Sequence, residues 1–291
     1  MLNPAVTGRG GFGTVYKATW RGIQVAVKEI TLPNEPEAPS PEARQELKRQ
    51  VRQVADDFVA EVEICCDLSH PNLVQLMGFA TKPRLLIVHE LLSGGSVDKQ
   101  LYIEHWKPRD EQVHKIALDV ARGMEYLHTA FEQPIIHRDL KSPNLLLVDI
   151  PADDAPTIHC KLADFGLSRD KGVESDMGTA LMTGCGSSLW MAPEIIIGSS
   201  YNEKIDIYSY AMCLLELLSC HLPWHAVPAP TVAFKVSQGA RPDEQLTSCT
   251  TSGRVPELVG IVRRCWIQQP AQRPSFSELV IELGRLLGGD E

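Results

Sequence analysis

A polar loop between two apolar runs contains the side chains best suited to chemistry in this sequence. The loop lies within residues 135–147, and Asn144 provides its side-chain amide. Further along, Asp164 precedes Phe165 and Gly166, so a carboxylate stands beside an aromatic ring and a flexible glycine. Carboxylate and amide oxygens suit the hard Mg²⁺ ion, which binds through few protein ligands and the phosphates of its substrate. We therefore expect Asn144 and Asp164 to be metal ligands.

A glycine-rich run near the start of the chain predicts a phosphate-binding loop. The pattern G-x-G-x-x-G-x-V is matched by Gly8, Arg9, Gly10, Gly11, Phe12, Gly13, Thr14 and Val15. Missing side chains let backbone amides approach phosphate oxygens closely. Taken alone, the run also fits a flexible turn or a dinucleotide-dependent oxidoreductase. The oxidoreductase requires a helix to open at the loop, and a β-rich run follows instead.

A lysine at the end of an apolar strand is the second candidate for phosphate binding. Alternation in residues 25–28 places Ala26 and Lys28 on one face, where Ala26 leaves room for a flat base and Lys28 reaches phosphate oxygens. An amine in this position needs an anion, and Glu61 is the candidate because it lies beside the apolar stripe of the next helix. Considered alone, Lys28 also fits an exposed lysine on an edge strand.

The segments that must position these residues divide into a strand-rich front and a helical remainder. Residues 14–30 predict a hairpin that turns at Arg21-Gly22, and residues 73–79 and 84–89 predict two more strands. Between them, Ser40-Pro41-Glu42 predicts the start of a helix whose apolar stripe runs from Leu47 to Leu68. Residues 93–96 predict a hinge, and helices are expected over 110–129, 205–219, 255–266 and 275–287. We thus expect a lobe of residues 1–92 and a helical lobe of residues 93–291, with a cleft of the kind that favours ligands.

Composition excludes several classes of protein. The 291 residues are 44% hydrophobic and 22% charged, which is typical of a globular chain and excludes a fibrous or tail-like role. The net charge of −9 argues against nucleic acid or an anionic membrane as partner. The most apolar stretch, 205–222, carries Asp206 and Glu216, so we interpret it as a buried helix and expect no membrane insertion. The eight scattered cysteines and the lack of a signal peptide predict reduced thiols and a cytoplasmic protein.

Five separated motifs, taken in order, resemble those of eukaryotic protein kinases across nearly the whole chain. They are the glycine pattern at 8–15, V-A-x-K at 25–28, H-R-D-L-x-x-x-N at 137–144, D-F-G at 164–166 and A-P-E at 192–194. Each motif alone is weak, but agreement of separate loops in one order is specific. The resemblance implies an α+β, bilobal protein-kinase fold, with a small antiparallel β-sheet lobe carrying one key helix and a larger, mainly α-helical lobe.

The resemblance assigns roles to the matched positions. The glycine loop would cover the phosphates of ATP, while Lys28, held by Glu61, would orient the α- and β-phosphates. Asp139 would accept or orient the proton of the substrate hydroxyl, Lys141 would steady the transferring phosphate, and Asn144 and Asp164 would hold Mg²⁺. The positions implied for adenine and the hinge are Val15, Ala26, His89, Glu90, Leu92 and Leu146, and a histidine is unusual at position 89.

Further expectations concern structure and regulation. The resemblance implies that Glu194 pairs with Arg273, and that Asp206 anchors a hydrophobic spine of Cys65, Leu76, His137 and Phe165. A phosphate on a hydroxyl between Asp164 and Glu194 would order that segment by pairing with Arg138, and Thr179 or Thr183 is the favoured site.

The kind of kinase is indicated by the catalytic loop and by the segment before Glu194. The lysine at position 141 resembles the catalytic-loop lysine of serine/threonine kinases. The sequence of residues 186–194 resembles that of the tyrosine-kinase-like group, which includes mixed-lineage, Raf-related and Roco kinases. The implied partners are ATP, proteins with Ser/Thr acceptors and regulatory domains outside this segment. The alternative is a pseudokinase, a nucleotide-binding scaffold, which the intact Lys28, Glu61, Asp139, Asn144 and Asp164 disfavour.

Overall fold

The computed structural model describes residues 5–10, 13–33, 40–151, 158–166, 169–170, 187–251 and 256–287. The chain forms two compact units, one of Met1–Ser69 with Val74–Leu91 and one of His70–Leu73 with Leu92–Glu291. The chain enters the second unit between Leu91 and Leu92, one residue before the predicted boundary between residues 92 and 93. Residues 70–73, which fall within the predicted first lobe, group with the second unit. There, Leu162 N donates to Asn72 O at 2.8 Å and Asn72 Nδ2 donates to Cys160 O at 3.0 Å.

The first unit contains an antiparallel sheet of five strands in the order β1-β2-β3-β5-β4. Its strands are β1 (Ala5–Gly10), β2 (Gly13–Trp20), β3 (Ile23–Ile30), β4 (Leu76–Ala80) and β5 (Leu85–Glu90). The predicted hairpin of β2 and β3 turns at Arg21 and Gly22, whose φ values of 51° and 84° are those of a tight hairpin turn. Strand β4 begins three residues later and ends one residue later than predicted, and β5 is shifted by one residue from the predicted 84–89.

Alternation along β3 gives the sheet two different faces. On one face, Val25 and Val27 pack with Ala18 in a buried cluster. On the other face, Ile87 of β5 packs with Phe58 and Val62 of helix α1 (Pro41–Asp67). Lys28 pairs with Ile87 in the ladder, so strand register places Lys28 on the face that α1 covers.

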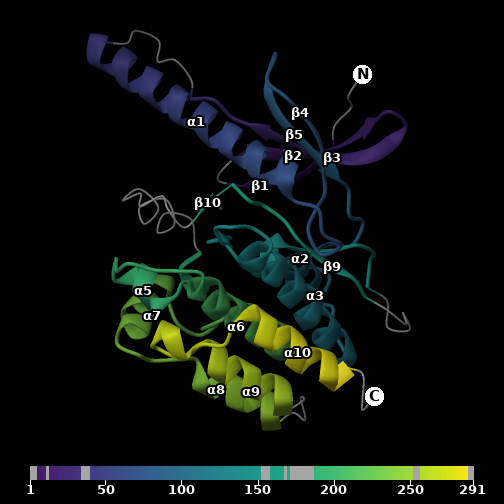
Figure 1. Ribbon diagram of the computed structural model, residues 1–291, viewed down its shortest axis with the longest axis vertical. Helices are drawn as coiled ribbons and strands as arrows, with labels where there is room; N and C mark the ends of the chain where they lie inside the picture. The colour runs from purple at the N-terminus through teal and green to yellow at the C-terminus, as the bar shows by residue number, and fades with distance from the viewer. Residues whose placement is uncertain are drawn as a thin grey trace. The chain divides into compact units, whose positions relative to one another are not determined.

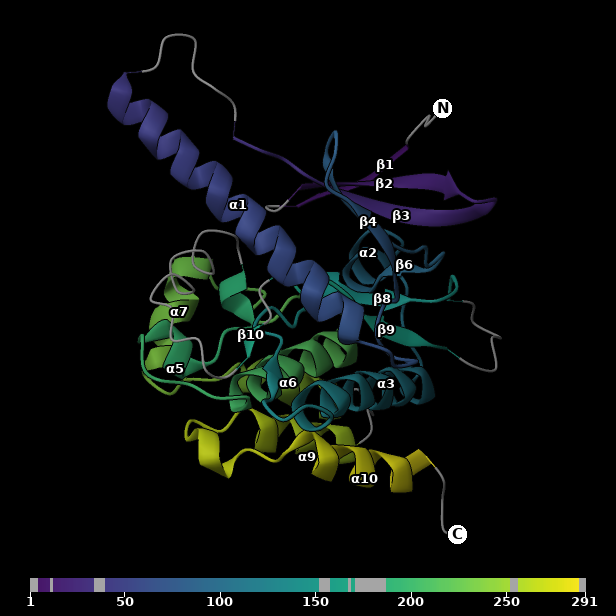
Figure 2. The same ribbon diagram turned by 45° about the horizontal axis from the view of Figure 1, so that its top comes forward.

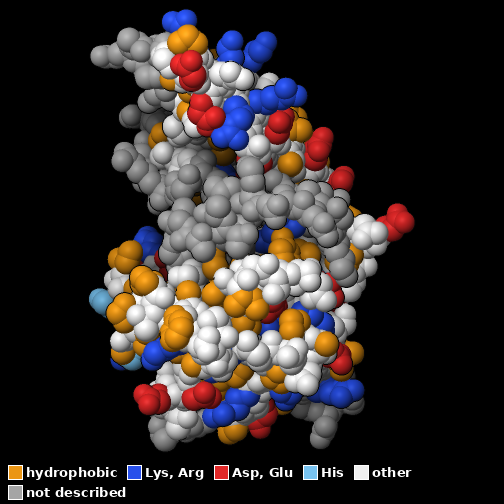
Figure 3. All heavy atoms as spheres, turned by 90° about the vertical axis from the view of Figure 1, so that its left-hand side faces the viewer, with side chains coloured by type: hydrophobic (Ala, Val, Ile, Leu, Met, Phe, Trp, Pro, Cys, Tyr) orange, Lys and Arg blue, Asp and Glu red, His pale blue; other side chains and the backbone are white. Residues whose placement is uncertain are grey.

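Helix α1 begins where the sequence predicts, and only its second half is buried. Ser40 caps it by accepting a hydrogen bond from Ala43 N at 3.2 Å. Its first turns extend past the strands (Figures 1 and 2). Basic side chains gather over this half of the helix in Figure 3, and the exposed ones are Arg44, Lys48, Arg49 and Arg52. Packing against the sheet therefore holds only the part of α1 that carries Glu61.

The second unit is mainly helical (Figure 1). Its helices are α2 (Val97–Tyr102), α3 (Asp110–Thr129), α5 (Pro193–Ile196), α6 (Lys204–Ser219), α7 (Ala229–Ser237), α8 (Asp243–Thr251), α9 (Pro256–Cys265) and α10 (Phe276–Leu287). Three further helical turns lie at Ser142–Asn144, Ser187–Leu189 and Pro270–Gln272. Short strands are β6 (Gly95–Ser96), β7 (Ile135–Ile136), β8 (Leu145–Leu147), β9 (Cys160–Leu162) and β10 (Arg169–Asp170).

Helix α6 is the core of this unit. Every residue from Ile205 to Leu218 is buried, so its charged members Asp206 and Glu216 lie in the interior and require partners. None of the helices among the described residues combines the length and the apolar composition that crossing a bilayer requires.

The predicted hinge at residues 93–96 lies within the second unit. Gly94 N donates to Leu147 O at 3.1 Å, and a side chain on Gly94 would meet Asp149 O at 2.2 Å. The glycine is thus explained by close contact with the strand β8 rather than by flexibility.

Candidate active site

The loop after β7 is fastened to helix α6 by a buried carboxylate. Asp206 accepts hydrogen bonds from His137 N at 2.9 Å and from Arg138 N at 3.0 Å, and His128 Nε2 lies 2.9 Å away. Complete burial on its own raises the pKa of Asp206, but the hydrogen bond and charge of His128 and the proximity of His137 lower the pKa overall. The carboxylate therefore stays ionised and fixes the loop just before Asp139.

Asp139 is held by two residues of its own loop. Lys141 Nζ lies 2.8 Å from Asp139 Oδ2. Asn144 Nδ2 donates to the main-chain oxygen of Asp139 at 2.8 Å and to Oδ2 at 3.1 Å. Arg138 has a φ of 67°, a backbone conformation that costs energy for a residue other than glycine. The loop thus holds a nearly buried carboxylate in one orientation beside a cation.

The two predicted metal ligands lie at the same end of a two-stranded ladder. Strands β8 and β9 pair antiparallel with Leu145 opposite Leu162, and Ala163 N donates to Asn144 O at 2.9 Å. Asp164 follows directly, with a φ of 65°. Because Asn144 uses its amide nitrogen to hold Asp139, its side-chain oxygen is the atom that suits a cation. An amide oxygen and a carboxylate are hard donors, so this pair fits Mg²⁺.

The predicted pair of Lys28 and Glu61 is present in the first unit. Lys28 Nζ lies 2.7 Å from Glu61 Oε1, and the two side chains are 12% and 6% exposed. Strand β3 and helix α1 contribute one partner each, as the helical spacing from Phe58 predicts. The alternative of a solvent-exposed edge lysine is therefore wrong.

Part of the glycine loop lies within the described backbone. Gly8, Arg9 and Gly10 are on β1, opposite Val15, Thr14 and Gly13 of β2, while Gly11 and Phe12 fall outside the described residues. Gly13 has a φ of 150°, and a Cβ there would lie 2.1 Å from Glu29 O of β3. The glycine at position 13 is thus required by contact between strands, whatever the loop binds.

The remaining predicted positions are spread over both units. In the first unit, His89 pairs with Ala26 across β5 and β3, and the Glu90 carboxylate accepts Gln75 N at 2.9 Å. In the second unit, Leu92 is half-buried, and Leu146 of β8 pairs with Ser96. Thr179 and Thr183 lie outside the described residues.

The expected pair of Glu194 and Arg273 is present and buried. Arg273 Nη1 and Nη2 bind the two Glu194 oxygens at 2.6 and 2.9 Å. The ring of His137 lies 5.5 Å from that of Phe165, as expected for neighbours in the predicted spine. Cys65 is buried in the first unit.

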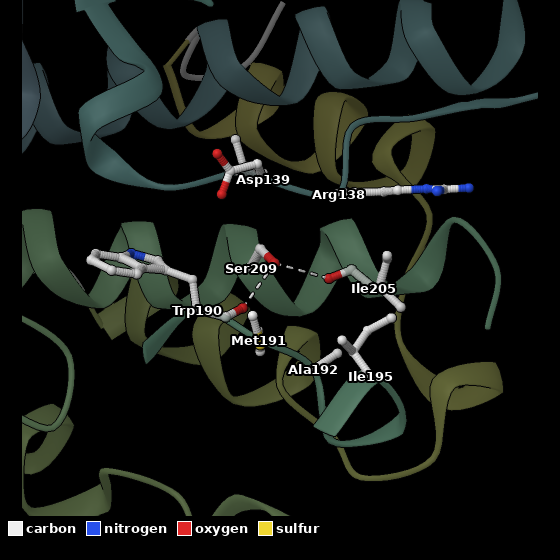
Figure 4. A pocket seen from close by; sticks show the side chains of 9 residues that line it. Arg138, Asp139, Trp190, Met191, Ala192, Ile195, Ile205 and Ser209 are labelled. Carbon is white, nitrogen blue, oxygen red and sulfur yellow. Dashed lines mark hydrogen bonds between the residues drawn. The ribbon is translucent and has the colours of Figure 1, made fainter. Parts of the chain in front are cut away.

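A small pocket lies beside the catalytic loop in the second unit. Asp139 and Leu140 line it together with Trp190 and Met191, which precede Pro193 and Glu194 (Figure 4). Ser209 of α6 donates to Trp190 O at 2.8 Å. The loop that carries Asp139, the segment before α5 and residues Ile205 and Ser209 of α6 therefore border one cavity.

A second buried carboxylate near this loop is Glu216, which the sequence placed in a buried helix but whose contacts it did not predict. Glu216 accepts hydrogen bonds from Ser142 Oγ at 2.5 Å, from the Tyr102 hydroxyl at 2.6 Å and from Trp190 Nε1 at 3.1 Å. Its presence in an otherwise apolar helix was the available signal, because a charged residue that is buried must have partners.

Known proteins resemble this chain over almost all of its length. A family model described as protein tyrosine and serine/threonine kinase matches residues 4–283. The serine/threonine-protein kinase VIK of Arabidopsis thaliana is 37% identical over 286 residues, which are 98% of this chain and 59% of that protein. The serine/threonine/tyrosine-protein kinase HT1 of the same plant is 34% identical over 282 residues, 94% of this chain and 63% of that protein.

A human protein adds a relative from another kingdom. Mitogen-activated protein kinase kinase kinase 11 of Homo sapiens is 33% identical over 283 residues, 97% of this chain and 30% of that protein. The chain thus spans less than two thirds of the length of each of these three relatives. Because the family model matches residues 4–283, which are nearly the whole chain, the chain belongs to the protein tyrosine and serine/threonine kinase family.

Proposed function

We propose that this chain is a protein serine/threonine kinase that transfers the γ-phosphate of ATP to hydroxyl groups of protein substrates. The observation that carries the proposal is the way Asp139 is held, with Lys141 and Asn144 on its carboxylate and Asp206 fixing the loop before it. Phosphoryl transfer needs no covalent enzyme intermediate, so a fixed base and neutralising charges supply most of the rate.

The chemical step uses the carboxylate and the cation of the loop. Asp139 accepts the proton of the substrate hydroxyl as its oxygen bonds to the γ-phosphorus, while the bond from that phosphorus to the bridging oxygen of ADP breaks. Lys141, 2.8 Å from Asp139, balances negative charge on the transferred group. Asn144 and Asp164 would hold Mg²⁺, which when bound neutralises charge on the phosphate oxygens.

Binding of ATP is assigned to groups that the sequence singled out. Lys28, whose ammonium is fixed by Glu61 at 2.7 Å, orients the α- and β-phosphates. We propose that the glycine run from Gly8 to Gly13 binds the phosphates, and that Val15, Ala26 and Leu146 are adenine-binding positions. The remaining positions proposed for adenine binding are His89, Glu90 and Leu92.

Lys141 and the names of the relatives support the proposed substrate class. Lys141 in the loop and the printed names of the relatives favour Ser and Thr as acceptors. We place the protein in the cytoplasm, in signal transduction, and expect regulatory domains because the relatives are longer than this chain.

An array of Ser, Thr and Tyr peptides with radiolabelled ATP and Mg²⁺ tests the proposal. We expect label on Ser and Thr peptides with the wild-type chain and none above background with Asp139→Asn. Binding of Mg-ATP without any labelled peptide or autophosphorylation would favour the pseudokinase instead.

A further inference from the structure

Two exposed histidines lie close together on the loop between α6 and α7, away from every residue assigned to ATP or to the chemical step. The ring centroids of His221 and His225 are 5.0 Å apart, and the ring planes meet at 65°. Both side chains are exposed to solvent. A neutral imidazole is the commonest protein ligand for metal ions, and it suits Zn²⁺ well. The pair therefore has the chemistry and the access that a metal site requires.

The distance between the two rings matches that of two histidines bound to one ion. With a Zn–N bond of about 2.1 Å, each ring centre lies about 3 Å from the metal, and two ligands at the tetrahedral angle have ring centres about 5 Å apart. The observed separation is 5.0 Å. Exposed side chains change rotamer within picoseconds to nanoseconds, so both rings can turn towards one ion without any movement of the main chain.

His221 is held in the tautomer that binds a metal through Nε2. Its Nδ1 lies 2.6 Å from Ser219 O. A carbonyl oxygen can only accept, so Nδ1 carries the hydrogen and the lone pair of the neutral ring is on Nε2. Histidines that bind metals usually donate their other ring N–H to a carbonyl or a carboxylate, which fixes the ring and makes the ligating nitrogen more basic. His221 already makes this second contact.

A side chain from helix α8 fixes the main chain beneath both rings. Gln245 Nε2 donates to His221 O at 3.3 Å and to Leu222 O at 3.1 Å, and Gln245 Oε1 accepts Trp224 N at 3.1 Å. Trp224, which lies directly before His225, is 6% exposed and has a φ of 62°, a conformation that costs energy for a bulky residue. The loop is thus anchored between the two histidines, and little main-chain order remains to be gained on binding.

The number of protein ligands determines the kind of site. Among the described residues, no group of three or more His, Cys, Asp or Glu side chains is placed to hold a metal ion. The histidine pair therefore offers two ligands and leaves the other coordination positions to water. Imidazole nitrogens favour a borderline ion such as Zn²⁺, whereas Mg²⁺ prefers oxygen. This chemistry differs from that of Asn144 and Asp164, which we propose as Mg²⁺ ligands.

We propose that His221 and His225 form a binding site for Zn²⁺, with Nε2 of His221 as one ligand atom and water in the open positions. The site lies on the loop that leads into α7, and α7 packs against α5 and against the turn Ser187–Leu189. None of the groups assigned to ATP or to phosphotransfer takes part. The site therefore stands or falls separately from the proposed kinase function.

Calorimetric titration of the whole chain with Zn²⁺, without ATP and in the presence of excess Mg²⁺, tests the site. We expect one Zn²⁺ per chain, and a loss of affinity of about 100-fold in His221→Gln and in His225→Gln, because each variant removes the gain from a second, linked ligand. Affinity that falls equally in His105→Gln, a control at another exposed histidine, would overturn the proposal. Displacement of Zn²⁺ by Mg²⁺ would overturn it too.

Two further controls separate the site from thiols and from misfolding. Cys66→Ser removes an exposed thiol and should leave the affinity for Zn²⁺ within about twofold of wild type, because thiolates take no part in the site. A loss of Zn²⁺ binding in Cys66→Ser would assign the metal to that cysteine instead. Both histidine variants should unfold within about 2 °C of wild type without metal, since the replaced side chains are exposed.

NMR of the histidine rings identifies the ligand atoms without any activity. Long-range ¹H–¹⁵N spectra distinguish the two nitrogens of each ring, and the His221→Gln and His225→Gln variants assign the resonances. We expect Zn²⁺ to shift Nε2 of His221 together with one nitrogen of His225, while Nδ1 of His221 keeps its hydrogen. A shift confined to one ring, or binding through Nδ1 of His221, would refute binding by the pair. If the wild type transfers no phosphate, the proposed function fails, and these spectra still decide whether the zinc site exists.

Discussion

The buried ion pair between Glu194 and Arg273 offers a quantitative test of the fold around the site. Replacing Arg273 with Met removes the guanidinium but keeps a long apolar side chain. The Arg273 side chain is 0% exposed and that of Glu194 is 8% exposed, with contacts of 2.6 and 2.9 Å between them. Arg273 also donates to the main-chain oxygens of Ile267, Lys204 and Gln268.

The expected cost follows from leaving a charge unpaired in the interior. Breaking a buried pair by removing one partner costs about 3–5 kcal/mol of the free energy of unfolding. For a domain of 150–250 residues, 1 kcal/mol corresponds to roughly 2–4 °C in Tm, so Arg273→Met should lower Tm by about 10 °C. The double variant with Glu194→Gln should recover part of this loss, because it leaves no unpaired charge.

Thermal unfolding monitored by circular dichroism measures this prediction, with an exposed pair as control. Arg263 lies 3.8 Å from Asp243, and their side chains are 51% and 61% exposed. An exposed pair contributes about 0–1 kcal/mol, so Arg263→Met should shift Tm by less than about 3 °C. Equal shifts for Arg273→Met and Arg263→Met would refute the reasoning that burial sets the cost.

Three further predictions concern phosphate binding, packing and pH. Lys28→Met should lower phosphotransfer by about 100-fold or more in a steady-state kinase assay, the scale for loss of one preorganised charge; near-normal turnover would contradict its role. Gly123→Ala should lower the free energy of unfolding, measured in urea, by about 1–2 kcal/mol. The added Cβ would lie 2.7 Å from Leu162 Cδ1, so overpacking outweighs the gain in helix propensity. The control Gly284→Ala has no atom within 4 Å of its Cβ and should stabilise, so a loss of stability there would undo the argument. Finally, Glu216 has a pKa of about 7 in the folded chain against its usual 4.5, so the folded state binds more protons in this window and stability falls as the pH rises from 4.5 to 7. Glu216→Gln should remove up to about 3 kcal/mol of this pH dependence in urea midpoints, and an unchanged profile would argue against the shift.

Long amphipathic segments were predictable from the sequence, whereas short polar helices were not. The expected helix over 110–129 is observed at those residues, because its apolar positions recur with helical spacing. Helix α8 was missed because a mixture of Asp, Glu, Thr and Ser over Asp243–Thr251 carries little helical periodicity. Helix α7 follows a proline-rich stretch and was missed too.

In the candidate site, contacts set by strand and helix periodicity were predictable, whereas contacts set by tertiary packing were not. The contact from Lys28 to Glu61 was predictable because strand alternation fixes one face and helical spacing fixes the other. The contacts of Glu216 were not predicted, since Ser142 lies 74 residues earlier and Tyr102 lies 114 residues earlier in the chain. Contacts of this kind depend on how α2, α6 and the loop pack together. The sequence indicates only that a buried charge must find partners.

In the proposed mechanism, Asp139 serves the chemical step and not the binding of ATP. Single-turnover phosphotransfer and Mg-ATP affinity, measured on the same preparations of wild type and Asp139→Asn, test it most directly. We predict a loss of about 10²–10⁴-fold in the rate, the usual contribution of a positioned general base, with ATP affinity within about threefold of wild type. Turnover by Asp139→Asn at the wild-type rate would contradict the account.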